Sequence, residues 1–184
     1  MKLTLPITIE KAEKLRAGDT LELTGTMFVA RDAAHKKIVE SMDKSEPLPF
    51  EVKDSTIYYM GPSPARPGQV IGSAGPTTSG RMDAYSPKLL KAGQRGMIGK
   101  GTRNQAVKDA IIKYGGVYMA AIGGAGALIS KAIKKAEIIA YPELGAEALL
   151  KIEVEGFPVV VVNDMQGGDL YMSAKEKYRT YKTS

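Results

Sequence analysis

Alternating apolar and polar positions in the first half of the chain predict strands. Residues 3–9 and 20–30 alternate apolar with polar or small side chains, a period of two that is typical of a strand with one buried face. A short helix is expected between them, at residues 10–16. Helical spacing of apolar residues predicts a second helix over residues 32–43. One further short strand, residues 56–60, lies in a segment rich in Pro and Gly.

The second half of the chain alternates strand patterns with helix patterns. Strands are expected at residues 96–99, 117–120, 137–140 and 158–162, and helices at 103–113 and 125–135. The apolar run at 158–162 is typical of a strand buried on both faces. Such alternation indicates an α/β fold, a mixed sheet with covering helices, formed as one domain over residues 1–184.

Composition and charge exclude several classes of protein. The chain has 43% apolar and 25% charged residues, as globular proteins do. It lacks a run of about 18 apolar residues, so no membrane span is expected, and the start lacks the apolar stretch of a secretory signal, which favours a cytoplasmic location. The net charge of +6 comes partly from lysines in the last ten residues, expected to be a solvated tail. Without a basic–aromatic motif, nucleic acid is not an expected partner.

Cysteine is absent and His35 is the only histidine. The chain therefore has no thiol nucleophile, no disulfide and no thiolate ligands for an iron–sulfur cluster or a structural zinc. We expect no metal site made by this chain alone.

The segment at residues 70–83 has the composition of a binding loop. It combines several glycines with Pro76, two adjacent hydroxyls, Thr77 and Thr78, and Arg81. Glycine lets a ligand approach the main chain closely, and a guanidinium matches the geometry of a carboxylate or phosphate. A small anion is the expected ligand. The alternative is a Gly-rich surface turn with a solvated arginine.

Two other glycine-rich stretches resemble nucleotide-binding motifs without matching them. Residues 93–101 have Gln94 and Gly101 where a P-loop requires Gly and Ser or Thr, and residues 124–129 lack the third glycine of a dinucleotide loop. The first stretch contains Lys100, at the expected end of a strand. Together with Arg31 and Arg81 it could form a set of cations suited to a dicarboxylate.

His35 follows Arg31 by one helical turn and is expected at the same end of that helix. A single histidine can be a catalyst, but it can also be a structural hydrogen-bonding residue, and the pattern leaves both readings open.

Three motifs resemble one known family, namely residues 30–35, 75–83 and 96–101, and the similarity continues at 136–145, 157–164 and 168–171. They look like the β subunit, or C-terminal domain, of class I fumarate hydratases and the related L-tartrate dehydratases. The resemblance implies a swivelling β/β/α domain. It also implies a partner, a larger α subunit whose three cysteines hold a [4Fe–4S] cluster, in a hetero-oligomer such as α2β2.

The resemblance also implies roles for individual residues. Thr77 matches the position proposed as the catalytic base, and His35 matches a position sometimes given an active-site role. The positions that match substrate-binding residues are Arg31, Thr78, Arg81 and Lys100.

The implied reaction is reversible hydration of fumarate to malate. Tartrate is the alternative substrate, and Gly80 and Asp83 favour fumarate, because the tartrate enzymes tend to have a bulkier residue and a Glu at these positions. From a different class of function, a non-catalytic anion-binding module remains the other hypothesis.

Overall fold

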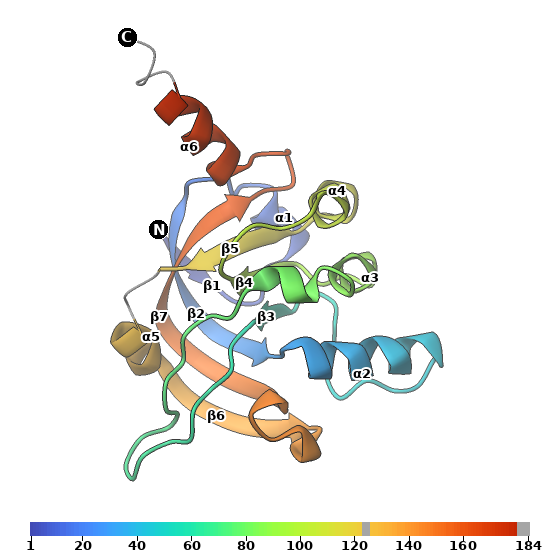
Figure 1. Cartoon of the computed structure of the whole chain (residues 1–184), viewed down its shortest axis with the longest axis vertical. Helices are drawn as coiled ribbons and strands as arrows, with labels where there is room; N and C mark the ends of the chain where they lie inside the picture. Colours follow the sequence, from blue (N-terminus) through green and yellow to red (C-terminus); the bar gives the residue numbers. More distant parts are fainter. Residues whose placement is uncertain (123–125, 180–184) are drawn as a thin grey trace.

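One seven-stranded sheet forms the frame of the part of the chain that the structure describes, residues 1–122 and 126–179 of a computed structural model (Figure 1). The strand order is β1-β2-β3-β4-β5-β7-β6. The strands are β1 (Lys2–Thr4), β2 (Thr20–Val29), β3 (Thr56–Tyr58), β4 (Gly96–Gly99), β5 (Val117–Ala121), β6 (Ile133–Ala140) and β7 (Leu149–Asn163). The helices are α1 (Ile9–Ala12), α2 (Asp32–Asp43), α3 (Ser86–Lys91), α4 (Gln105–Tyr114), α5 (Gly126–Ala132) and α6 (Leu170–Arg179), with 3-10 turns η1 (Ser79–Met82) and η2 (Pro142–Glu147).

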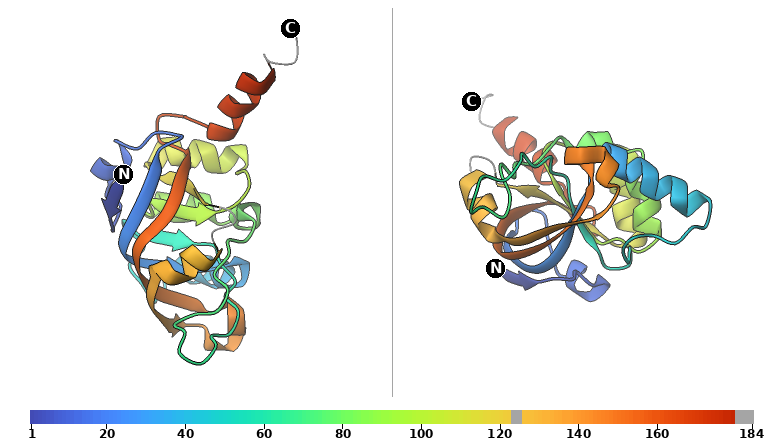
Figure 2. Two further views of the ribbon diagram at one scale, coloured as in Figure 1. Left: turned by 90° about the vertical axis from the view of Figure 1, so that its left-hand side faces the viewer. Right: turned by 90° about the horizontal axis from the view of Figure 1, so that it is seen from below.

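The strand pairings close a ring, and within it the parallel pairing of β2, β3 and β4 brings their ends to one edge. Strands β3, β4 and β5 are parallel, and β2 joins them as a parallel neighbour of β3 through Phe28 and Val29. The 15-residue strand β7 runs antiparallel to β2 and also pairs with β5, which completes the ring β2-β3-β4-β5-β7. Figure 2 shows β2 (blue) and β7 (orange) curving side by side past the parallel strands.

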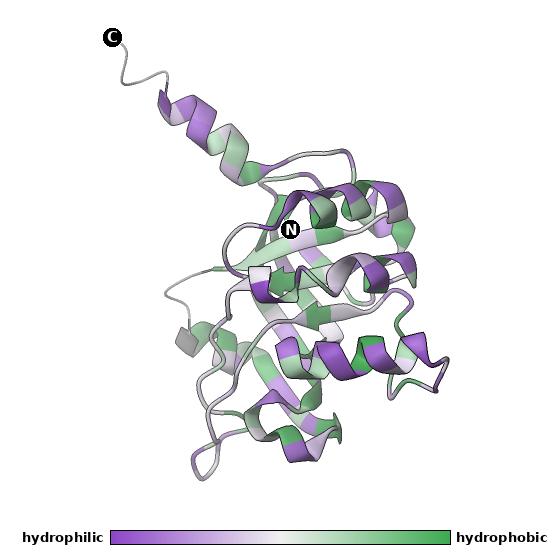
Figure 3. Ribbon diagram, turned by 45° about the vertical axis from the view of Figure 1, so that its right-hand side comes forward, coloured by the Kyte–Doolittle hydropathy of each residue, from purple (hydrophilic) through white to green (hydrophobic). Residues whose placement is uncertain are grey.

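Two hydrophobic cores lie on the two faces of the parallel strands. Inside the ring, Ile98 and Met119 pack with apolar residues of β2 and β7. On the outer face, Met97 and Tyr118 belong to a second cluster, which includes residues of α2, α3 and α4. Successive residues of a strand point to opposite faces, so neighbours in sequence enter different cores. The fold class is therefore as expected, a mixed sheet with covering helices, and Figure 3 shows apolar and polar residues mixed along these helices.

Several expected elements have different bounds in the structure. The first strand ends at Thr4, just before Leu5 and Pro6, and the first helix covers only Ile9–Ala12. The helix expected at 125–135 ends at Ala132, because the next residue, Ile133, already pairs with β7. The apolar run 158–162 is the end of β7, and it is not buried on both faces throughout, since Val160 is half-buried.

Two helices were not expected from the sequence, α3 and α6. The basic end of the chain, expected as a solvated tail, is helical through Arg179, although α6 buries none of its residues and extends away from the sheet (Figure 1). Residues 123–125, which include the first two residues of the candidate dinucleotide motif and the expected start of the helix at 125–135, lie outside the described residues, as does Lys182. Among the described helices, none has the length and apolar character needed to cross a membrane.

Candidate functional site

The carboxyl ends of three neighbouring parallel strands form the candidate site. Arg31 follows the end of β2, Gly61 follows the end of β3, and Lys100 follows β4 directly. Because β2, β3 and β4 pair in parallel and in this order, their ends lie at the same edge of the sheet. Ligands of α/β proteins bind at such edges, where loops leave the strands.

The Gly-rich segment returns to this edge and pairs with it through the main chain. The Thr77 amide donates to the Tyr59 carbonyl at 2.8 Å, and the Lys100 amide donates to the Thr77 carbonyl at 3.3 Å. The Ser79 amide then donates to the Lys100 carbonyl at 2.9 Å, and Thr78 forms a parallel bridge with Lys100. These bonds place both threonines beside Lys100. The turn η1 follows at once and contains Arg81.

Positive charge and hydroxyls are accessible at this edge. The side chains of Thr78, Arg81 and Lys100 are exposed, and Thr77 is half-buried. Within the described part of the chain, no carboxylate lies within 4 Å of the charged nitrogens of Arg81 or Lys100. Both cations are therefore available to an anionic ligand.

Arg31 has a different environment from the other two cations. It is the residue before α2, and its side chain is 23% exposed. Its Nε lies 3.6 Å from Glu147 Oε1 and 3.8 Å from Asp32 Oδ1, so two carboxylates already offset its charge. Gly61 packs directly on this side chain, because a Cβ at that position would lie 2.5 Å from Arg31 Nη1. The structure thus brings Arg31 to the predicted edge, already paired.

His35 lies beneath the site and is fully buried. Its Nδ1 is 2.8 Å from the carbonyl oxygen of Arg31, which can only accept, so Nδ1 carries the proton. Burial lowers the pKa of His35 from 6.5 to about 4. The ring meets Tyr59 edge to face, with centroids 5.4 Å apart. This neutral, enclosed geometry fits a structural hydrogen-bonding residue, and an active-site role for His35 stays a prediction.

A buried ion pair that sequence reasoning missed lies below Arg81 and Lys100. Arg103, whose side chain is fully buried, donates from Nε to Asp83 Oδ1 at 2.6 Å and from Nη2 to Ser86 Oγ at 2.6 Å. The other oxygen of Asp83 accepts from the Asn104 amide at 2.8 Å. No local pattern indicates this burial, because Arg103 stands at the start of an expected helix, where an arginine is usually solvated.

Close packing also joins the end of β4 to the Gly-rich segment. Tyr118 donates its hydroxyl proton to the Gly101 carbonyl at 2.8 Å, so Ser79 Oγ, 2.8 Å from the same hydroxyl, must be the donor to Tyr118. Gly99 permits this approach. A Cβ at position 99 would lie 2.0 Å from Ser79 Oγ, well inside any real contact.

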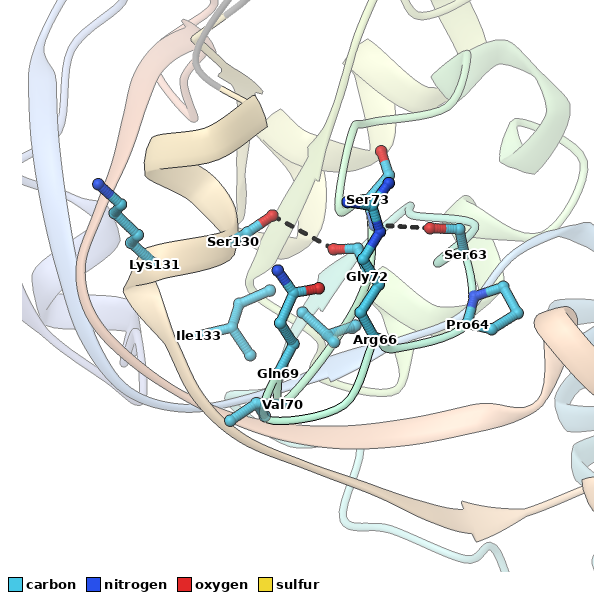
Figure 4. A pocket seen from close by; sticks show the side chains of 11 residues that line it. Ser63, Pro64, Arg66, Gln69, Val70, Gly72, Ser73, Ser130, Lys131 and Ile133 are labelled. Carbon is cyan, nitrogen blue, oxygen red and sulfur yellow. Dashed lines mark hydrogen bonds between the residues drawn. The ribbon is translucent and has the colours of Figure 1, made fainter.

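The first residues of the Gly-rich segment are anchored by α5 and by the loop that precedes the segment. A hollow of about 690 Å³ lies there, between residues 63–73 and 130–133 (Figure 4). Ser130 Oγ donates to the Gly72 carbonyl at 3.3 Å, and the Ser73 amide donates to Ser63 Oγ at 2.7 Å. These bonds fix the loop that leads from β3 to Thr77.

The described residues do not fit an iron–sulfur cluster. The sequence contains no cysteine, and residues 1–122 and 126–179 contain no group of three or more His, Asp or Glu side chains placed to hold a metal ion. What the edge offers is positive charge, hydroxyls and main-chain groups, which suit the binding of a small anion.

Comparison with known proteins gives matches over nearly the whole chain. The family model described as Fumarase C-terminus matches residues 1–174. The chain is 48% identical over 153 residues to "Fumarate hydratase class I, aerobic" of Salmonella typhimurium, which covers 82% of this chain and 26% of that protein. It is 48% identical over 156 residues to "Fumarate hydratase 2" of Leishmania major, covering 84% of this chain and 28% of that protein.

A relative of similar length is also found. The chain is 35% identical over 177 residues to "Putative L(+)-tartrate dehydratase subunit beta" of Methanocaldococcus jannaschii, which covers 93% of this chain and 91% of that protein. The chain therefore spans about a quarter of the length of the two fumarate hydratases and nearly all of the archaeal subunit.

Proposed function

The chain belongs to the Fumarase C-terminus family, and from that membership we propose that it is the β subunit of a two-subunit hydro-lyase that adds water to fumarate to give malate. The observation that carries the proposal is the pair of exposed cations, Arg81 and Lys100, beside the hydroxyls of Thr77 and Thr78 at the carboxyl ends of parallel strands. Two cations at one edge match the two carboxylates of such a substrate.

Each residue of the edge has a part in this proposal. Arg81 and Lys100 bind the substrate carboxylates, with Arg31 as a third cation and Thr78 as a hydrogen-bonding neighbour. In the dehydration direction the Thr77 side chain, as an alkoxide, accepts the proton from the carbon next to a carboxylate and becomes the neutral hydroxyl. An alcohol can do this only where nearby positive charge stabilises the alkoxide. We assign this task to the two exposed cations of the edge, Lys100, whose main chain pairs with that of Thr77, and Arg81.

A partner chain is the second part of the proposal. The chain corresponds to about a quarter of each fumarate hydratase named above but to nearly all of a protein named as a subunit. We therefore place the [4Fe–4S] cluster of this enzyme class on a separate α subunit, where it would supply Lewis-acid chemistry. A cytoplasmic α2β2 assembly is part of the same proposal.

Fumarate is preferred to L-tartrate as the substrate. The 48% identical relatives are named as fumarate hydratases, and the 35% identical relative as a tartrate dehydratase subunit. Gly80 and Asp83 also differ from the residues that the resemblance associates with tartrate enzymes. A side chain at Gly80 would meet open space, so a bulkier residue there would reach the solvent side of the turn.

Co-expression with the candidate α chain tests the proposal. The complex, with its cluster reconstituted under anaerobic conditions, is assayed on fumarate, malate and L-tartrate, and each chain is assayed alone. We expect hydration of fumarate by the complex only, with the β chain alone colourless and free of iron. A complex that is inactive on all three substrates would contradict the enzyme function and favour an anion-binding module. Full activity of the α chain alone would contradict the role given to this chain.

A further inference from the structure

Arg103 has no part in the function proposed above, yet it is the buried charge closest in sequence to Lys100. We propose that Arg103 is a positioning residue, which holds the turn bearing Arg81 and the loop bearing Lys100 in the arrangement that receives a dicarboxylate. The dicarboxylate substrate in this inference rests on the proposed function, whereas the contacts of Arg103 are those of the structure.

The guanidinium of Arg103 connects the two cation-bearing segments directly. Asp83, its partner at 2.6 Å, follows Arg81 by two residues, and Arg103 itself follows Lys100 by three. Asp83 closes the connection a second time by accepting the Asn104 amide at 2.8 Å. A displacement of this pair therefore moves Arg81 and Lys100 relative to each other.

Aromatic and hydroxyl neighbours hold the guanidinium in one orientation. Its carbon lies 5.0 Å from the centroid of Tyr118 and 5.4 Å from that of Tyr59. The same tyrosines hold the Gly-rich segment, since Tyr118 accepts the hydroxyl of Ser79 and the carbonyl of Tyr59 accepts the amide of Thr77. The residues under the site thus form one polar layer centred on Arg103.

Lysine cannot replace arginine in this layer. A guanidinium is planar and presents several donors in a fixed fork, and here it binds Asp83 and Ser86 from different nitrogens. An ammonium keeps the charge but cannot reproduce both bonds and the contacts with the two rings. Arg103→Lys therefore tests the directed hydrogen bonds of the guanidinium while the positive charge is kept.

The matched control is Arg95, at the opposite end of β4. Its Nη1 donates to the carbonyls of Tyr114 and Gly115, each at 2.8 Å, and its side chain is 15% exposed. It is thus a largely buried arginine next to the same strand, at the end away from the candidate site. Arg95→Lys reports what a lost arginine fork costs the fold alone.

The test compares Arg103→Lys, Asp83→Asn and Arg95→Lys in the full chain and in the reconstituted complex. We expect Arg103→Lys to reduce kcat/KM on fumarate by ~10²-fold, mainly by raising KM, because misplacement of a binding group by about 1 Å has effects of that order. Arg95→Lys should keep a kcat/KM near that of the wild type, even where its melting temperature falls as much as that of Arg103→Lys or more. Asp83→Asn should reduce kcat/KM about as much as Arg103→Lys does. Arg103→Met should reduce it further.

Amide hydrogen exchange gives a second measurement that needs no activity. The amides of Ser79 and Asn104 bond across the two segments, so Arg103→Lys should speed their exchange by at least about tenfold more than Arg95→Lys does. Equal exchange in the two variants, or equal kcat/KM at matched melting temperature, would overturn the positioning role. If the wild-type complex were inactive, the proposed function would fail, and the exchange comparison would still decide this inference.

Discussion

Replacing His35 by Gln should remove an acid sensitivity of folding that this buried ring causes. Burial lowers the pKa of His35 from 6.5 to about 4. The unfolded chain therefore takes up a proton at a higher pH than the folded chain does. The stability contributed by the neutral ring is complete above pH 6.5 and is lost as the pH falls toward 4. At about 1.36 kcal/mol per pKa unit, the loss is roughly 2 kcal/mol by pH 5 and roughly 3 kcal/mol near pH 4.

Denaturant unfolding of the full chain at several pH values measures this effect. Because His35 is the only histidine, few other side chains titrate between about pH 7.5 and pH 5. The free energy of unfolding of the wild type should fall by about 2 kcal/mol more over this range than that of His35→Gln, whatever the stability of the variant at the upper end. Parallel pH dependences would show that His35 is not held neutral in the fold, which would also reopen the proton-carrying role that its burial argues against.

Three further predictions concern the edge of the sheet. Gly99→Ala should lower the free energy of unfolding by about 1–3 kcal/mol, as overpacking does, because the new Cβ would lie 2.0 Å from Ser79 Oγ. Thermal or denaturant unfolding measures this change, and an unchanged stability would contradict the close packing. Thr77→Val should reduce kcat of the complex by ~10²–10⁴-fold, with a smaller effect of Thr78→Val, and equal small effects in steady-state kinetics would leave Thr77 only a loop-shaping role. Arg81→Met should reduce kcat/KM on fumarate by at least ~10²-fold, and near-wild-type kinetics in a folded complex would contradict its binding of a carboxylate.

The sequence predicted those elements whose pattern is complete within a short segment. The helix at residues 32–43 was found with its bounds, because its apolar spacing records the face that it buries. The boundary between α5 and β6 was misplaced, because it depends on pairing of Ile133 with a strand that comes later in the chain. Local periodicity carries no information about such a partner.

Some residues of the candidate site could likewise be predicted from the sequence, and others could not. Thr77, Arg81 and Lys100 could be singled out because glycines and turn residues surround them in the sequence. Arg103 could not, because its burial depends on Asp83, twenty residues earlier, and on Tyr118 in β5. Residues that touch a ligand leave a local signal, whereas residues that hold them in place are visible only in the fold.

The exposure of the two free cations bears on why this edge would need a second chain. Arg81 and Lys100 are exposed, and an ion pair made in water is worth about 0–1 kcal/mol. A hydrogen bond to a charged group contributes about 1.5–3 kcal/mol once water is kept away from it. The edge as it stands would therefore hold a dicarboxylate only weakly, and a wall that covers it would strengthen each contact. In the proposed function, the partner chain supplies that wall.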